Sequence, residues 1–421
     1  MKFNLFKQKP VILTLKNGLK VHLIHENSHQ TYVELDVSLG SFNLSYQIDD
    51  EVFHIIPGAA HFLEHKMFSM PEGDAFKKFY ELGVTSNALT TYRQTSYTLN
   101  GSTHILDATL YLLKMMDTPY FTDENVLSEQ KIIREEIQMY DDEPETVIYQ
   151  KMYRSLLWNH PMMHEITGTK DDVLKIDRSH LTRIYQDFYQ HSNRQLLILG
   201  PIDIDMYIKV LMDYDVQEVT HKKVALLPVF EPKHVKSKVE TIYVDHSMPV
   251  LSIGFKYQQK NSDEETLFRT ETAMLFLARM MFGSNTLFTE KLISDGIINE
   301  AFEMQITMED QTMVFVMDVS TDEPYKLKDL IFEHFFKEGI HDLNQEAFEL
   351  LKRAYLGSYL MAVDDIENRL YLYGKYYMSH MSLEEAVSIL SAFRLEDVLS
   401  LYHVFTDDMI SVVYALPKSL K

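Results

Sequence analysis

The sequence predicts an α+β protein of two homologous halves, each a mixed or antiparallel sheet covered by helices, joined as a clam-like pair. Two observations support this fold class. Strand-like and helix-like segments follow one another in a mixed order, which favours separate layers over a doubly wound parallel sheet. The same order of segments then begins again near residue 250, and repetition of this kind indicates a duplicated folding unit.

The first half opens with a predicted hairpin over residues 11–25. Asn17-Gly18 stands between two apolar runs, which is the strongest short-range hairpin signal. Residues 31–40 alternate between apolar and polar side chains, as in a strand with one buried face. The other expected elements are helices over 58–68, 73–82, 103–117, 123–157 (interrupted near Asp141–Pro144) and 178–190, and strands over 95–100 and 196–199.

The second half repeats these segments in the same order. The matching stretches are 250–255 with 35–40, 275–282 with 61–68, and 398–405 with 181–188, and an apolar strand follows at 410–415. Coincidence among common helical patterns is the alternative, and the preserved order argues against it. We therefore expect one half at 1–215, a weakly periodic linker at 216–235 and a second half at 236–421.

The chemistry is expected on the helix over residues 58–68. His61, Glu64 and His65 stand at i, i+3 and i+4, so a helix places them on one face. Two imidazoles one turn apart can bind one metal ion, and a carboxylate beside them can reach a water on that ion. The spacing is the inverted zinc-peptidase pattern. An ordinary helix with two surface histidines is the alternative.

A third metal ligand is expected from the later helix that carries Glu129 and Glu136. These residues are two helical turns apart and share a face, with Ile132 and Ile133 at its edges, so that face should point partly inward. A carboxylate in a packed interface is costly unless it is paired or bound to metal. Glu135 lies further round the helix and is expected to face solvent.

The metal residues have no counterparts in the second half. The residues that replace them are Leu275, Ala278 and Arg279 on the first helix, and Lys352 and Tyr359 on the second. The acids are absent where the histidines are absent, which indicates one lost site rather than two unrelated changes. An ordinary acidic helix in the first half is the alternative.

The composition excludes several classes of protein. The chain has no cysteine, which leaves His and carboxylates as the available zinc ligands. A formal net charge of −22 argues against binding nucleic acid or an anionic lipid surface. No apolar run is long enough to span a membrane, and residues 1–10 lack the apolar core of a secretory signal. We expect a cytoplasmic protein.

The chain resembles the insulinase/pitrilysin family of zinc metallopeptidases over nearly its whole length. The stretches that match are Asn17-Gly18, His61–His65, Ser86–Ala88 with Thr90, Glu129 with Glu136, and His160–Thr169. The resemblance implies that His61, His65 and Glu136 bind Zn²⁺, that Glu64 is the catalytic base and that Glu129 supports the site. In size the chain is similar to the short bacterial members that are related to mitochondrial processing peptidase.

This resemblance implies a zinc endopeptidase that acts on peptides or unfolded segments. Zinc lowers the pKa of its bound water to about 7, and Glu64 would take the proton and return it to the leaving amine. Asn87 and Ala88 would present a strand edge to which an extended peptide adds as a further strand. A turn-forming role for Asn87 is the alternative.

One departure from the family pattern bears on activity. Active members carry an Arg and a Tyr that hold the substrate near zinc, from the metal-less half or from a partner subunit. Here the matching positions are about Ile293 and Asn299 or Glu300. We therefore expect a homo- or heterodimer, with a metal-less paralogue as the partner that supplies the pair. A catalytically weak or idle zinc-binding scaffold and a peptide-binding subunit of a hetero-oligomer are the alternative functions.

Overall fold

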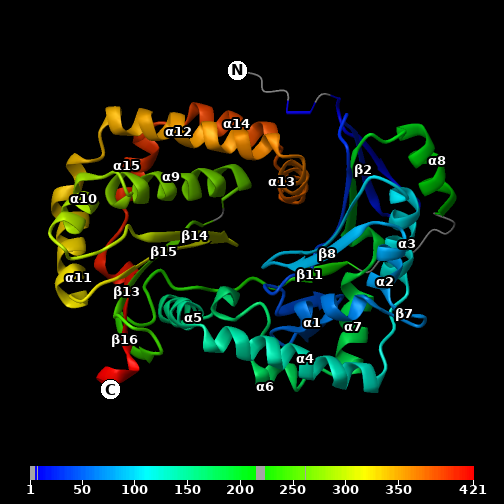
Figure 1. Ribbon diagram of the computed structural model, residues 1–421, viewed down its shortest axis with the longest axis horizontal. Coiled ribbons are helices and arrows are strands. Elements are labelled where there is room, and N and C mark those ends of the chain that lie inside the picture. Colours follow the sequence, from blue (N-terminus) through cyan, green and yellow to red (C-terminus); the bar gives the residue numbers. More distant parts are fainter. Residues whose placement is uncertain (1–4, 7, 215–222, 261) are drawn as a thin grey trace.

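A computed structural model describes residues 5–6, 8–214, 223–260 and 262–421, and Figure 1 shows two sheet-and-helix halves side by side. The first-half sheet has the order β1-β2-β10-β3-β9-β8. Its strands are β1 (Val11–Thr14), β2 (Lys20–His25), β3 (Thr31–Val37), β8 (Thr85–Thr90), β9 (Thr95–Gly101) and β10 (Arg194–Gly200). Only β2 and β10 pair in parallel, so the sheet is mixed, as predicted.

The second-half sheet reproduces this topology without the outermost strand. Its order is β12-β16-β13-β15-β14, which corresponds strand by strand to β2-β10-β3-β9-β8. The strands are β12 (Val239–Val244), β13 (Val250–Gln258), β14 (Glu303–Glu309), β15 (Thr312–Ser320) and β16 (Ile410–Pro417). Again only one pair, β12 with β16, is parallel. The repeat predicted from the sequence is therefore present in the strand order.

Helices cover the sheets in each half. The first-half helices are α1 (Ala59–Met67), α2 (Ala75–Glu81), α3 (Ile105–Asp117), α4 (Asp123–Asp142), α5 (Pro144–Leu156), α6 (Lys170–Val173), α7 (Arg178–Phe188) and α8 (Ile204–Tyr214). The second-half helices are α9 (Glu264–Phe282), α10 (Leu287–Ser294), α11 (Pro324–Glu333), α12 (Gln345–Asp364), α13 (Ile366–Met378), α14 (Leu383–Ala392) and α15 (Leu395–Tyr402). In the described residues, no helix combines the length and apolarity that crossing a membrane requires.

Each half contributes one helix to the other. Helix α5 packs on β12, β13, β15 and β16 of the second sheet, and α13 packs on β3 and β10 of the first, as Figure 1 shows. The approach of α5 is close because Gly254 has no side chain, and a Cβ there would lie 2.4 Å from Met152 Sδ. This exchange of helices covers the second face of each sheet over those strands.

The chain turns from α4 into α5 at Pro144, close to the predicted interruption. Proline has no N–H and is tolerated in the first turn of a helix, so it can begin α5 but could not continue α4. Glu143, between the two helices, is extended, with φ −88° and ψ 114°. The new direction leads α5 under the second sheet while α4 stays against α1.

Several short elements were not predicted from the sequence. They are β4 (Ser45–Ile48) and β5 (Glu51–His54), β6 (Ser69–Met70) and β7 (Gly73–Asp74), and β11 (Val224–Leu226). The β6–β7 hairpin occupies the start of the helix expected at 73–82, so α2 begins later, where the Asp74 side chain accepts a hydrogen bond from Phe76 N. Strand β11 lies in the expected linker and pairs with β4, while residues 215–222 lie outside the described part. The boundaries 1–215, 216–235 and 236–421 stay predictions.

Candidate metal centre

Helix α1 places the three motif residues on one face, as the spacing predicted. Gly58 precedes the helix in the left-handed conformation (φ 88°), where an L side chain is strained. A Cβ at Gly58 would also lie 2.3 Å from Thr167 O, so glycine allows residues 167–168 to approach the start of α1. The stretch that follows His160 therefore lies against the start of the motif helix.

Helix α4 packs against α1 and brings Glu136 to both histidines. The distances are 3.6 Å from His61 Nε2 to Glu136 Oε1 and 3.6 Å from His65 Nε2 to Glu136 Oε2. One ligand atom from each of the three residues lies within 4.8 Å of the others. Zn–N and Zn–O bonds of about 2.0–2.1 Å in a tetrahedron place neighbouring ligand atoms about 3.3–3.4 Å apart, so this donor set fits zinc.

The imidazole of His61 is in the neutral state that a metal ligand requires. Its Nδ1 is buried and has no hydrogen-bond partner among the described residues. Burial, and then the neighbouring His65, lower the pKa of His61 to about 3. The imidazole is therefore neutral around pH 7 and keeps a lone pair for a metal ion, which is the state that metal binding requires.

Glu129 contacts the ring nitrogen of His65 that faces away from Glu136. Its Oε1 lies 3.1 Å from His65 Nδ1, which leaves Nε2 of that ring for the metal, a common arrangement around ligating histidines. Burial alone would lower the pKa of His65, but the Glu129 hydrogen bond and nearby carboxylates outweigh it and raise that pKa. Glu135 is exposed, as predicted. Ile132, expected at the inner edge of this face, is instead 53% exposed, because Ile133 and Ile137 set the buried side of α4.

Lys66 was not identified from the sequence. Its side chain is 1% exposed, and Nζ lies 3.5 Å from Glu129 Oε2 and donates to Ser69 Oγ at 2.9 Å. Burial would raise the pKa of Glu129, but His65 and Lys66 outweigh it and lower that pKa, so the carboxylate stays ionised. The only sequence signal for Lys66 is a charged residue on the buried side of the motif helix.

Glu64 stands beside the metal group but is not part of it. It is buried, and Thr90 at the end of β8 donates a hydrogen bond to its Oε2 at 2.5 Å. Burial raises the pKa of Glu64, and the hydrogen bond from Thr90 opposes this effect in part. The contact holds one carboxylate oxygen in place and leaves the other available to accept a proton.

Strand β8 is an edge of the first sheet and borders the site. Ala88 lines the same cleft as the metal group, whereas Asn87 is exposed and is not among the residues that line it. Asn87 Oδ1 accepts a hydrogen bond from the N–H of Ala88 at 2.9 Å. The Asn87 side chain therefore covers a backbone donor of the strand whose edge was predicted to receive a peptide.

The metal group opens into a cleft of about 850 Å³ shared by both halves. The second half contributes Glu303, Gln305 and Asp318 to its lining. Neither Ile293 nor Asn299 lines the cleft, and no arginine does so among the described residues. The first half contributes four tyrosines, which are Tyr92, Tyr140, Tyr149 and Tyr153.

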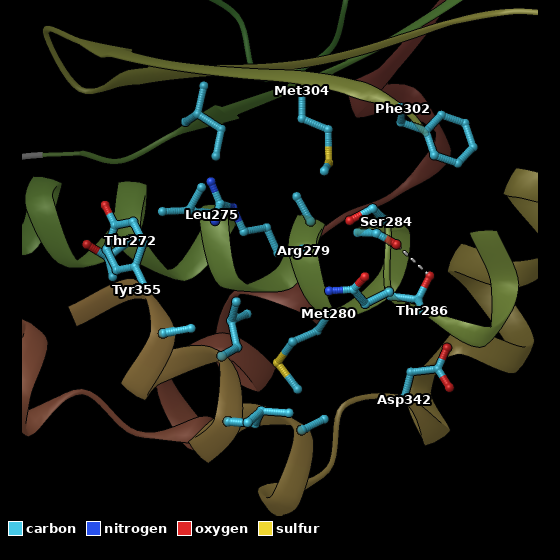
Figure 2. Close-up of a pocket in the computed structure, with 18 of the residues that line it drawn as sticks. Thr272, Leu275, Arg279, Met280, Ser284, Thr286, Phe302, Met304, Asp342 and Tyr355 are labelled. Atoms are coloured by element: carbon cyan, nitrogen blue, oxygen red, sulfur yellow. Dashed lines mark hydrogen bonds between the residues drawn. The ribbon is translucent and has the colours of Figure 1, made fainter. Parts of the chain in front are cut away.

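A second cavity, of about 980 Å³, lies at the corresponding place in the second half. Figure 2 shows Leu275 and Arg279 of α9, Met304 of β14 and Tyr355 of α12 around it. Tyr359 also lines this cavity, whereas Lys352 donates from Nζ to Phe393 O at 2.7 Å. Within the described ranges, the single group of metal-ligating side chains is the one in the first half, as the sequence predicted.

The duplicated α+β fold, together with the two histidines of an inverted zinc motif and Glu136 from a neighbouring helix, defines a two-domain protein of the metallopeptidase class. The chain belongs to the insulinase family, peptidase family M16. The family model described as insulinase (peptidase family M16) matches residues 20–170, and the model of the peptidase M16 inactive domain matches residues 175–355.

Individual relatives cover the full chain or one of its halves. The uncharacterized zinc protease YmfH of Bacillus subtilis is 28% identical over 411 residues, which are 96% of each chain. A probable mitochondrial-processing peptidase subunit beta of Schizosaccharomyces pombe is 26% identical over 48% of this chain and 44% of its own. A solved structure from Alicyclobacillus acidocaldarius, described as an M16-like peptidase, superposes with a TM-score of 0.92 at 26% identity, covering 99% of this chain and 100% of that one.

Proposed function

We propose that the protein is a zinc-dependent endopeptidase that hydrolyses bonds in peptides or unfolded segments. The observation that carries the proposal is the placement of His61, His65 and Glu136 around one point, with Glu64 buried beside them and facing the same cleft. The name of the B. subtilis relative, a zinc protease, supports the same activity.

The residues of the chain divide the work. His61, His65 and Glu136 would hold zinc, which when bound lowers the pKa of a water and polarises the scissile carbonyl. Glu64 would accept the proton of that water on the oxygen that Thr90 leaves free, and later donate it to the leaving amine. Glu129 would fix the orientation of the His65 ring, with Lys66 holding Glu129 in turn.

Strand β8 would position the peptide. An extended segment that adds to the free edge needs the N–H of Ala88, and the Asn87 side chain now occupies that donor. We expect Asn87 to rotate away when a peptide binds and then to contact the peptide backbone. Since an added strand must be extended, unfolded or short peptides are the expected substrates.

The test is Glu64→Gln in the zinc-loaded protein. Because Glu64 is beside the metal group and not in it, the variant should keep one zinc per chain, measured by mass spectrometry of the metal. Cleavage of a mixed peptide library should fall by about 10²-fold or more, the contribution typical of a general base. Loss of zinc from this variant would show that Glu64 is a ligand, and unchanged cleavage would contradict its role as the base.

A second candidate function is a slow zinc-binding subunit that needs a metal-less paralogue. The lining of the cleft favours it, because no arginine of the described residues faces the metal group. Substrate positioning contributes a large share of enzymatic rate, so a cleft without such a clamp would bind metal normally and turn over slowly. A partner chain would then supply the missing contacts.

A further inference from the structure

The second half contributes two neighbouring carboxylates to the wall of the cleft that holds the metal group. Glu303 on β14 and Asp318 on β15 are direct partners in the antiparallel register, and both line the cleft. Side chains paired in this way have Cβ atoms about 4.5–5.5 Å apart, and like charges there are destabilising. A positive charge beside both carboxylates would therefore stabilise the pair.

The described part of the chain does not supply that charge. Neither Glu303 nor Asp318 has an ion-pair partner among the described residues, and no Lys or Arg lines the cleft there. Asp318 Oδ1 is buried without a hydrogen-bond partner. Burial raises the pKa of Asp318 to about 6. The hydroxyl of Ser252, its register partner on β13, lowers this pKa in part, and the negative charge of Glu303 raises it further.

Two other acids of the cleft, Glu145 and Glu165, lie outside the metal group and belong to the first half. Glu165 forms an ion pair with Arg154 at 2.5 Å, so its charge is already offset. Glu145, at the start of α5, lies 3.8 Å from His246 and is otherwise exposed, which adds negative charge at the rim. On the second-half wall of the cleft, the carboxylates without an ion-pair partner among the described residues are Glu303 and Asp318.

We propose that Glu303 and Asp318 form a subsite for a cationic group of the peptide, either a Lys or Arg side chain or the terminal ammonium. The inference rests on the proposed function, since it places this subsite in the cleft that holds the scissile bond. A cation between the two carboxylates replaces their mutual repulsion by charge-assisted hydrogen bonds. The net charge of −22 also raises the local concentration of basic peptides.

The experiment compares matched peptides on matched variants. Peptides that differ at one position, Lys against norleucine, are each prepared with a free and with an acetylated N-terminus. The variants are Glu303→Gln, Asp318→Asn and the double variant, and the control is Glu290→Gln, an exposed acid on α10 outside the cleft. The wild type and the control should prefer the cationic peptide by about tenfold in kcat/KM.

The double variant should lower this preference to about twofold or less, with kcat/KM for the neutral peptide unchanged within about twofold. Glu303→Gln alone, which does not alter a buried side chain, should remove about half of the preference on a logarithmic scale, so the test does not depend on folding of the Asp318 variant. If acetylation alone abolishes the preference, the cation is the terminal ammonium, and if the lysine is required, it is the side chain. An equal loss for both peptides, or a wild type without preference, would overturn the subsite.

Binding separates this inference from the proposed activity. Zinc-loaded Glu64→Gln should bind the cationic peptide about tenfold more tightly than the neutral one by fluorescence anisotropy, and the double variant in that background should not. A binding preference without cleavage by the wild type would uphold the subsite and contradict the peptidase. Cleavage of both peptides without any preference would uphold the peptidase and contradict the subsite.

Discussion

Replacing Glu231 by Gln should loosen the contact between the two halves. Glu231 lies in the expected linker, and its side chain and that of Lys256 on β13 are both 0% exposed, with 2.8 Å between Oε1 and Nζ. The same carboxylate accepts hydrogen bonds from the backbone N–H groups that follow α5, at 3.0 Å from Trp158, 2.8 Å from Asn159 and 2.9 Å from His160. One side chain therefore connects the first half to the second sheet.

The expected cost is about 3–5 kcal/mol, the range found when one partner of a buried ion pair is removed and the other charge stays buried. For a domain of about 150–250 residues, each kcal/mol lowers Tm by about 2–4 °C, so Tm should fall by about 6–20 °C. Replacing Lys256 by Met as well should recover part of the loss, because the unpaired ammonium is then gone.

The assay uses the single tryptophan of the chain, Trp158, whose indole Nε1 donates to His234 O at 3.2 Å beside this pair. In Glu231→Gln, the emission of Trp158 should lie further to the red, and the unfolding transition that it reports should occur at a lower temperature. The control is Glu240→Gln, which breaks the partly exposed pair with Lys151 (2.9 Å) and should cost at most about 1 kcal/mol. A Tm within about 2 °C of the wild type, with unchanged emission, would refute the reasoning.

Three further outcomes are expected. Glu136→Gln should weaken zinc binding by about 10-fold or more, whereas Glu135→Gln should leave it unchanged in a competition titration, and equal effects would contradict the helix phase. A metal-less paralogue should raise peptide turnover by at least about tenfold, or 1.4 kcal/mol, at equal zinc occupancy, and full activity of the lone chain would contradict this. Burial would raise the pKa of Glu231, but Lys256 and the N–H donors outweigh it and lower that pKa, so the pair contributes its stability above about pH 4.5, the unfolded value. That stability should be lost as pH falls through the lower folded value, and the Tm difference between wild type and Glu231→Gln should shrink there.

Local chemistry made the metal group predictable. On any helix, the i, i+3, i+4 spacing places His61, Glu64 and His65 on one face. The seven-residue separation of Glu129 and Glu136 likewise places those two side chains on one face. The repeat predicted the second half and its missing ligands. Lys66 and the hydrogen bond from Thr90 to Glu64 were not predicted, because both depend on which side chains the packing of α1 against α4 and β8 brings together.

The sequence by itself determined the two-half α+β fold, the hairpin turn at Asn17-Gly18 and the residues of the candidate metal group, since periodicity and short spacings act within one element. The tertiary structure decided what lies between the halves. Alternation along β3 places Asp36 opposite the apolar face, yet it is 0% exposed because α13 covers that side, and Gln195 Nε2 donates to it at 2.8 Å. Glu303 and Asp318 are neighbours because the antiparallel register of β14 and β15 pairs them on one wall of the cleft. Such contacts join residues that are apart in the sequence, and strand pairing together with the packing of helix on sheet sets their distances.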